Sequence, residues 1–184
     1  MYLLLRRYDV QTLGYRAPEV IVGRPFSHAI DTWSLGVTLA ELYSGRPFVQ
    51  AASRGGLVIQ LAQLLGRPPP ALLAGSKYGA ELAPLVAHTP TAHDRSTRRA
   101  KLAAALRAPP TRADQLFMDL LATMLAYDAD ERPTPAASLG HPFFAPVFPF
   151  GIISATEAGA RVKEEDAPGK GRAARESESK RRRV

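Results

Sequence analysis

The sequence predicts a mainly α-helical protein. Apolar residues return every three or four positions along residues 29–44 and 114–127, which is the spacing of an amphipathic or buried helix. No segment shows the regular alternation or the β-branched runs that favour a strand. The chain has 184 residues, of which 46% are apolar, so one domain with its own core and a tail are expected.

The helix expected over residues 29–44 has apolar side chains on nearly every face. This pattern indicates a buried helix rather than a surface helix. Gly45 suits the left-handed position that often follows a helix, and Pro47 prevents the helix from continuing.

Three further helices are expected in the middle and later parts of the chain. Residues 57–65 form an apolar stretch that ends at a glycine followed by prolines, and residues 114–127 have six large apolar side chains at helical spacing. Residues 95–107 are rich in good helix formers. Two turn-forming, proline-rich stretches separate these helices within residues 66–112.

A short helix is expected near residue 135. Thr134 is a favourable N-cap residue, and Pro135 suits the first helical position because its missing N–H group would have no helical partner there. Gly140 is expected to end this helix.

Composition excludes several classes of function. The chain has no cysteine, so it has no disulfide and no thiolate metal site, and no apolar run approaches the roughly 20 residues of a membrane span. Residues 161–184 hold nine Lys/Arg and five Asp/Glu, which leaves only +3 of the total +7 on residues 1–160. Nucleic-acid binding by the globular part is therefore not expected, and residues 151–184 are predicted to be a disordered basic tail.

Four short motifs follow one another in a characteristic order. They are Thr-Leu-Gly-Tyr-Arg-Ala-Pro-Glu at residues 12–19, Asp-Thr-Trp-Ser-Leu-Gly at 31–36, Asp-Glu-Arg-Pro-Thr at 130–134 and His-Pro-Phe-Phe at 141–144. Together they resemble the helical C-terminal lobe of a eukaryotic protein kinase. The resemblance implies a C-lobe from the activation segment onward over residues 1–150, with an insert at about 66–112, and no N-lobe or catalytic loop in this chain.

Part of the first motif and one further stretch narrow the resemblance to one branch of the family. Tyr-Arg-Ala-Pro-Glu at residues 15–19 is similar to the group that contains cyclin-dependent, mitogen-activated and dual-specificity tyrosine-regulated kinases. Gly-Arg-Pro-Pro-Pro-Ala-Leu-Leu at residues 66–73 resembles the start of that group's insert, as in dual-specificity tyrosine-regulated and homeodomain-interacting kinases.

The resemblance assigns structural roles to the Ala17-Pro18-Glu19 motif and to Arg132. In the family, the glutamate of this motif forms a buried ion pair with a distant arginine and so holds the activation segment. A bidentate arginine is a suitable partner for a buried carboxylate. The alternative is a helix-start glutamate and an unrelated surface arginine.

Asp31, Trp33 and Gly36 form the second structural set. The resemblance implies that Asp31 accepts hydrogen bonds from the catalytic loop, that Trp33 packs below it and that Gly36 allows a close approach. The resemblance implies that this loop covers Asp31, because a buried charge in a helix that is apolar all round needs a partner. Without the loop, the surface of residues 29–44 that it would cover is expected to be exposed to water. The alternative is an acidic residue favoured by the dipole of the first helical turn.

The resemblance makes residues 12–16 a substrate-binding surface. Thr12 is associated with serine/threonine acceptors, and Leu13, Gly14, Tyr15 and Arg16 would form the shelf for the residue after the phosphoacceptor. The group usually has an arginine at the position of Leu13, so a requirement for proline at that substrate position is not implied.

The residues of phosphoryl transfer do not occur in the sequence. It contains no G-x-G-x-x-G loop, no His-Arg-Asp and no Asp-Phe-Gly. The family uses ATP and Mg²⁺, but this chain alone is expected to bind neither, and we expect no catalytic residue and no metal ligand in it. His141 is expected to cap a helix while Phe143 and Phe144 pack.

Two functions therefore stay open. The chain is either part of a serine/threonine protein kinase, with a protein substrate and the missing kinase portion as partners, or a non-catalytic binding or docking module. An intracellular location, nuclear or cytoplasmic, is expected. Lys-Arg-Arg-Arg at residues 180–183 resembles a nuclear-localisation signal and is equally consistent with a solvated tail.

Overall fold

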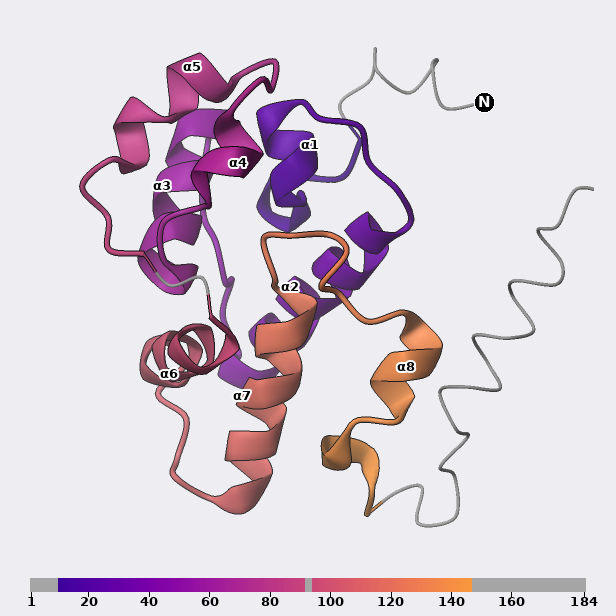
Figure 1. Ribbon diagram of the computed structural model, residues 1–184. Helices are drawn as coiled ribbons and strands as arrows, with labels where there is room; N and C mark the ends of the chain where they lie inside the picture. The colour runs from indigo at the N-terminus through magenta and orange to yellow at the C-terminus, as the bar shows by residue number, and fades with distance from the viewer. Residues whose placement is uncertain (1–9, 92–93, 147–184) are drawn as a thin grey trace, which may run out of the picture.

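The computed structural model describes residues 10–91 and 94–146 (Figure 1). This part of the chain is helical and contains no β-strand, as the sequence predicts. The predicted domain end at 150 and the predicted tail lie outside the described residues. In chain order the elements are η2 (Leu13–Tyr15), α1 (Pro18–Val22), α2 (Ala29–Ser44), α3 (Arg54–Leu65), α4 (Pro70–Leu73), α5 (Gly79–Leu82), η3 (Pro84–Val86), α6 (Arg95–Ala105), α7 (Arg112–Met124), α8 (Pro135–Leu139) and η4 (Pro142–Phe144).

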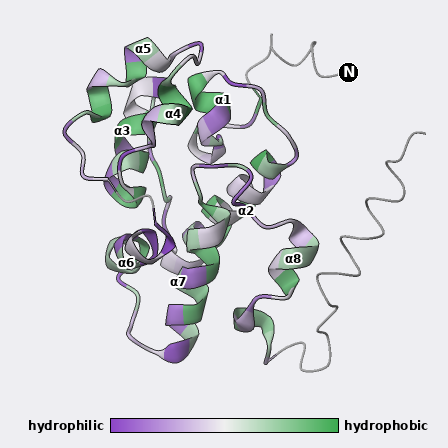
Figure 2. Cartoon of the chain, viewed as in Figure 1, coloured by the Kyte–Doolittle hydropathy of each residue, from purple (hydrophilic) through white to green (hydrophobic). Residues whose placement is uncertain are grey.

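The helices form two groups, with α2 lying between them (Figure 1). α1, α3, α4 and α5 lie together on one side, and α6, α7 and α8 lie on the other (Figure 1). α7 packs against both α2 and α6, and α3 packs against α1 and α6. The ribbon of Figure 2 shows apolar residues on much of α3 and α4, and α1 packs against both of these helices.

Side-chain caps set where two of the predicted helices begin. α3 starts at Arg54 and α7 at Arg112, each a few residues before the expected start, because Ser53 and Thr111 each accept a hydrogen bond from a backbone N–H of the first turn. α7 ends at Met124 rather than at 127. There the chain turns, which places Tyr127 in the core, 4% exposed.

The bounds of α2 match the prediction, and Gly45 adopts the left-handed conformation expected after the helix, with φ of 66°.

The expected burial of α2 on all sides is wrong. Leu35 is 47% exposed and Leu42 is 74% exposed, whereas Trp33 on the opposite side is fully buried. α7 and neighbouring segments cover only that opposite side, so an apolar stripe of α2 remains at the surface.

Gly36 lies where α2 meets the end of α7. A Cβ atom at this position would stand 3.0 Å from a methyl of Leu125 and 3.1 Å from Cβ of Met124. The absence of a side chain therefore allows the two helices to approach closely. An alanine here would require Leu125 and Met124 to shift by a few tenths of an ångström.

His141 caps η4 rather than α8. Its Nδ1 accepts a hydrogen bond from the N–H of Phe143 at 3.2 Å, and the Phe143 ring packs on Phe117 with 5.1 Å between centroids. The other ring nitrogen lies 3.3 Å from Oδ2 of Asp119. Both oxygens of this carboxylate also accept hydrogen bonds from Arg95. The predicted cap and packing are thus present, in the final 3₁₀ turn.

This cluster gives the fold a pH dependence. Partial burial lowers the pKa of His141, an effect that outweighs its hydrogen bond to Asp119 and that the charge of Arg95 reinforces. The unfolded chain therefore binds a proton at His141 more readily than the folded chain does. The stability that neutral His141 contributes is full above about pH 6.5, and it is lost as the pH falls through the lower pKa of the folded state. We expect the urea midpoint to fall on acidification towards about pH 5.5, and to fall less in His141→Asn. Equal pH dependence in the two proteins would contradict this role.

Candidate functional site: a segment held on helix α2

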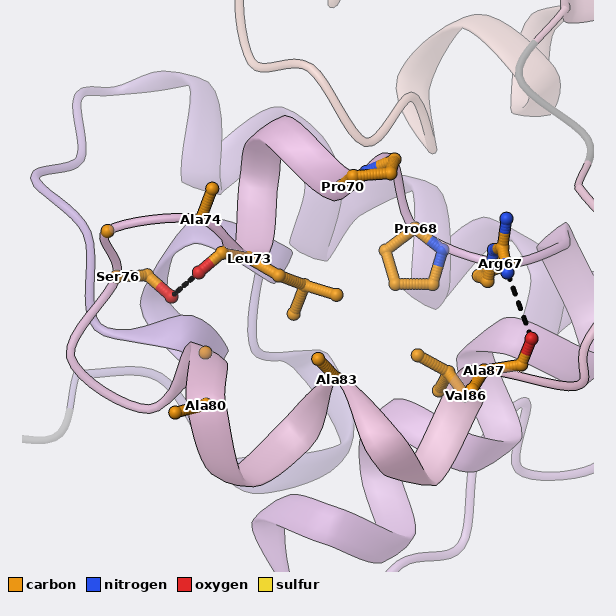
Figure 3. Close-up of a pocket in the computed structure, with 12 residues that line it drawn as sticks. Arg67, Pro68, Pro70, Leu73, Ala74, Ser76, Ala80, Ala83, Val86 and Ala87 are labelled. Atoms are coloured by element: carbon orange, nitrogen blue, oxygen red, sulfur yellow. Dashed lines mark hydrogen bonds between the residues drawn. The ribbon is translucent and has the colours of Figure 1, made fainter.

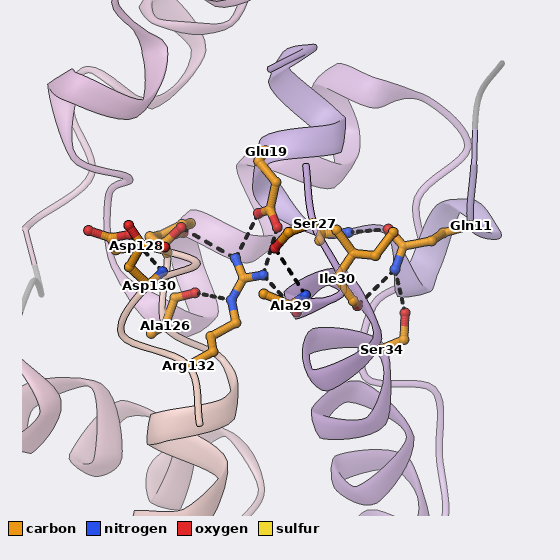
Figure 4. Close-up of polar contacts among 12 residues, drawn as sticks. Gln11, Glu19, Ser27, Ala29, Ile30, Ser34, Ala126, Asp128, Asp130 and Arg132 are labelled. Atoms are coloured by element: carbon orange, nitrogen blue, oxygen red, sulfur yellow. Dashed lines mark hydrogen bonds and ion pairs between the residues drawn. The ribbon is translucent and has the colours of Figure 1, made fainter. Parts of the chain in front are cut away.

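Gln11 fixes the start of the segment that contains the predicted substrate-binding residues. Its side-chain Nε2 donates to the carbonyl of Ile30 at 2.9 Å and to Oγ of Ser34 at 2.6 Å, and its Oε1 accepts from the N–H of Ala17 at 2.9 Å (Figure 4). One side chain therefore joins both ends of the segment to α2. Gln11 has a φ of 66°, which is uncommon for a residue other than glycine.

Tyr15 is the second attachment to α2. Its hydroxyl donates to Oε2 of Glu41 at 2.6 Å, and Oγ of Ser34 donates to its carbonyl at 2.9 Å. The hydrogen bond to Glu41 raises the pKa of Tyr15 above its usual value. The second carboxylate oxygen of Glu41 accepts from the N–H of Phe48 at 3.0 Å. Glu41 thus joins the segment to the loop after α2, and the Tyr15 ring is held in one orientation.

We expect Tyr15→Phe to lower the urea midpoint of unfolding by a small amount, because one partly buried hydrogen bond is lost while the ring remains. Amide hydrogen exchange should also quicken at Phe48, whose N–H shares the Glu41 carboxylate. Tyr78→Phe is the matched control, since the Tyr78 ring lies under Arg54, 3.9 Å from its guanidinium carbon, and that contact uses only the ring. An unchanged exchange rate at Phe48 would contradict the coupling through Glu41.

The remaining residues of the predicted surface differ in exposure. Thr12 is exposed, and Leu13 and Gly14 are half-buried in η2. Arg16 is only 7% exposed, and its guanidinium donates to the backbone carbonyl of Gln11 at 3.1 Å. Thr12, Leu13 and Gly14 therefore face outward to different degrees, while Arg16 lies beneath them and supports the turn.

Glu19 and Arg132 form a buried, bidentate ion pair. The two hydrogen bonds, from Nη1 to Oε1 and from Nη2 to Oε2, are each 2.7 Å long (Figure 4). Arg132 also donates to the carbonyls of Ala126 at 2.8 Å and Ala29 at 3.0 Å. Its guanidinium lies 5.1 Å from the centre of the Trp33 ring. One arginine therefore joins α1, α2 and the turn after α7.

Ala17 and Pro18 place Glu19 at the start of α1. Pro18 occupies the first helical position, where no backbone N–H is required, and Ala17 before it is fully buried in the core. This local geometry directs Glu19 inward towards Arg132 rather than into solvent.

Asp31 lies uncovered, as expected for residues 29–44 without the catalytic loop, and its role as an acceptor for that loop stays a prediction. Asp31 is exposed, in the first turn of α2 and on the same side as Leu35 and Leu42. An acidic residue is favourable at this end of a helix because of the helix dipole. Within residues 10–91 and 94–146, no loop covers it.

The described residues contain no group of three His, Asp or Glu side chains that could hold a metal. The sequence also lacks the glycine-rich phosphate loop. None of the described helices combines the length and the apolar character that crossing a membrane would require.

These features are those of a protein kinase C-lobe. The protein kinase domain model matches residues 6–144, and the chain belongs to the protein kinase domain family, whose members use ATP and Mg²⁺. The chain also resembles the branch that contains the dual-specificity tyrosine-regulated kinases, as the motifs predict.

Three relatives illustrate this similarity. The chain is 34% identical over 163 residues to dual specificity tyrosine-phosphorylation-regulated kinase 3 of Homo sapiens, covering 76% of this chain and 27% of that protein. The kinase of the same name from Rattus norvegicus is 33% identical over 176 residues, covering 83% and 29%. Dual specificity tyrosine-phosphorylation-regulated kinase 2 of Drosophila melanogaster is 33% identical over 142 residues, covering 74% and 19%. The chain thus spans less than a third of the length of these relatives.

Proposed function

We propose that this chain forms the substrate side of the C-lobe of a serine/threonine protein kinase. It would supply the activation segment and the surface that receives a protein substrate during ATP-dependent phosphorylation. The observation that supports this most directly is the firm attachment of residues 11–19. Gln11, Tyr15 and Glu19 each bond to a separate part of the helical core.

The segment of residues 11–19, which is attached to the helical core, suits the recognition of an extended peptide. Thr12 is exposed at its start, and Leu13 and Gly14 follow in a tight turn with little side-chain bulk at Gly14. We infer that Thr12 favours serine or threonine as the acceptor and that Leu13, an uncharged residue, imposes no requirement for proline after it. Arg16 supports this surface from below by its hydrogen bond to Gln11.

The nucleotide would bind to another part of the kinase. Transfer of a phosphoryl group depends on positioned charges, and the motifs that supply them do not occur among these 184 residues. Asp31, Leu35 and Leu42 form an exposed stripe on α2. This stripe offers the nucleotide-binding part of the kinase an apolar surface with one carboxylate acceptor. The missing kinase portion is thus the partner that this site favours, beside the protein substrate.

This exposed stripe carries a prediction about stability. Leu35 and Leu42 leave apolar area in water, so we expect the isolated 184-residue chain to be only marginally stable, with a free energy of unfolding of about a few kcal/mol. Thermal unfolding followed by circular dichroism should give a broad transition at low temperature. A sharp transition at high temperature would contradict the prediction.

The proposed activity can be tested on the endogenous protein. It would be purified with an antibody against residues 95–107 and incubated with ATP, Mg²⁺ and peptides that differ only in carrying serine, threonine or tyrosine as the acceptor. We expect phosphorylation of serine or threonine. We also expect a loss of about tenfold or more in Thr12→Ala, but not in Thr91→Ala, an exposed threonine of the insert. Absence of phosphorylation would overturn the proposal and favour a docking module, and phosphorylation of tyrosine alone would overturn the assigned specificity.

A further inference from the structure

The insert contains a slot that lies apart from residues 11–19. One wall is α4 with the prolines before it, and the other is α5 with η3 (Figure 3). The slot has a volume of about 670 Å³, within the range typical of ligand-binding clefts. Its lining is mainly apolar, with Pro68, Leu73, Ala83 and Val86 facing the space.

The two walls are held at a fixed separation. At one end Arg67 donates to the carbonyl of Ala87 across the slot, at 2.9 Å. Near the other end α5 approaches the carbonyl of Leu73 so closely that a Cβ on Gly79 would stand 1.9 Å from its oxygen. Only glycine permits this approach. The slot is therefore already formed in the folded chain, which reduces the cost of ordering it when a ligand binds.

Arg67 gives one end of the slot a positive charge. Its guanidinium lines the slot, and Nη1 is held there by the carbonyl of Ala87. A carboxylate is the acceptor that a guanidinium binds best. An anionic group placed beside the apolar lining would pair with this guanidinium.

The surroundings favour an acidic protein segment as the occupant. Residues 66–112 hold eight Lys/Arg and two Asp/Glu, so this insert would attract a negatively charged partner. No aromatic residue lines the slot, which does not suit a proline-rich peptide, and the described residues offer no strand edge for a β-strand to join. A helix with one apolar face remains as the fitting form.

We propose that this slot binds an acidic amphipathic helix of a partner protein. A leucine-sized side chain enters between Leu73 and Val86, and a carboxylate at one end of the helix pairs with Arg67. This docking is independent of phosphoryl transfer, and so its test stands whether or not the chain works within a kinase.

The test uses the full 184-residue chain and a short fluorescein-labelled helical peptide, with leucines one and two turns apart on one face and a glutamate at one end. Binding is followed by fluorescence anisotropy. Arg67→Glu reverses the charge in the slot, and Lys77→Glu makes the same change at an exposed residue that does not line it. Ala80→Trp fills the slot from an exposed lining position, and Ala71→Trp adds the same ring on α4 outside it. Circular dichroism checks that each variant is folded.

We expect the peptide to bind and its affinity to fall by about tenfold or more in Arg67→Glu and Ala80→Trp, with little change in the two controls. Equal weakening by Lys77→Glu would show attraction by net charge alone and would overturn the proposal. Full binding by Ala80→Trp would overturn it as well. Laurate is titrated in parallel as a small amphipathic acid. Binding of laurate without binding of the peptide would overturn the proposal.

Discussion

Replacing Arg132 with alanine is expected to lower the free energy of unfolding by about 3–5 kcal/mol, the usual cost of removing one partner of a buried ion pair. The Glu19 carboxylate would remain buried, 5% exposed, without its cation. The carbonyls of Ala126 and Ala29 would lose a donor in the same change. Because one side chain joins α1, α2 and the turn after α7, the loss should affect the whole domain.

Urea unfolding followed by circular dichroism measures this effect. The expected result is a much lower midpoint or no remaining transition. Arg99→Ala is the control, because Arg99 is 49% exposed and lies 3.9 Å from Asp119, and such a surface pair contributes little. A double-mutant cycle with Glu19→Gln and Arg132→Met should give a strong coupling between the two residues. Similar small losses in Arg132→Ala and Arg99→Ala would contradict the role assigned to the buried pair.

Replacing Trp33 with alanine is expected to cost about 3–5 kcal/mol as well, for a different reason. The Trp33 side chain is fully buried and packs against the Tyr127 ring at 6.4 Å between centroids, with Arg132 over its face. Alanine would leave a cavity at the centre of α2 that its neighbours cannot fill. The packing of α2 on α7 would then weaken.

Two comparisons separate the packing of Trp33 from other effects. Trp33→Phe keeps an aromatic ring and removes a buried Nε1–H that has no acceptor in the described part of the chain, so it should cost less than half as much. Leu42→Ala, on the exposed side of the same helix, should change stability by less than about 0.5 kcal/mol. Since Trp33 is the sole tryptophan, circular dichroism must replace fluorescence as the probe. A loss of under about 1 kcal/mol in Trp33→Ala would contradict the account of the core.

The helices could be predicted well because their signals are local. Apolar spacing and the glycine after it gave α2 its correct bounds, and Thr134 with Pro135 gave the start of α8. The starts of α3 and α7 were misplaced because Ser53 and Thr111 precede the apolar pattern that the prediction followed. A capping residue three or four positions upstream of the expected start was the available signal.

The exposure of α2 could not be predicted from the same pattern. An apolar side chain at Leu35 or Leu42 has the same spacing whether another element covers it or not. Exposure of Asp31 was expected only from the absence of the covering loop, and not from the apolar pattern of its helix. Whether a face is covered depends on segments far away in sequence or in another polypeptide.

The candidate site, too, could be predicted only in part from the sequence. Glu19 and Arg132 are 113 positions apart, and only the family motifs indicated that they meet. The role of Gln11 was missed, because a single glutamine before Thr12 has no distinctive spacing. Its left-handed backbone, which turns the side chain towards α2, appears only in three dimensions. The slot in the insert likewise depends on a close approach at Gly79 that the sequence does not reveal.

The most direct test of the central claim is the intact mass of the endogenous protein, measured together with the transcript sequenced to its 5′ end. If the chain works within a serine/threonine kinase, the product should be larger than 19.9 kDa and should include His-Arg-Asp and Asp-Phe-Gly ahead of residue 12. A product of 19.9 kDa whose coding sequence lacks both motifs would contradict the claim. The slot beside Arg67 would then be the first place to look for its function.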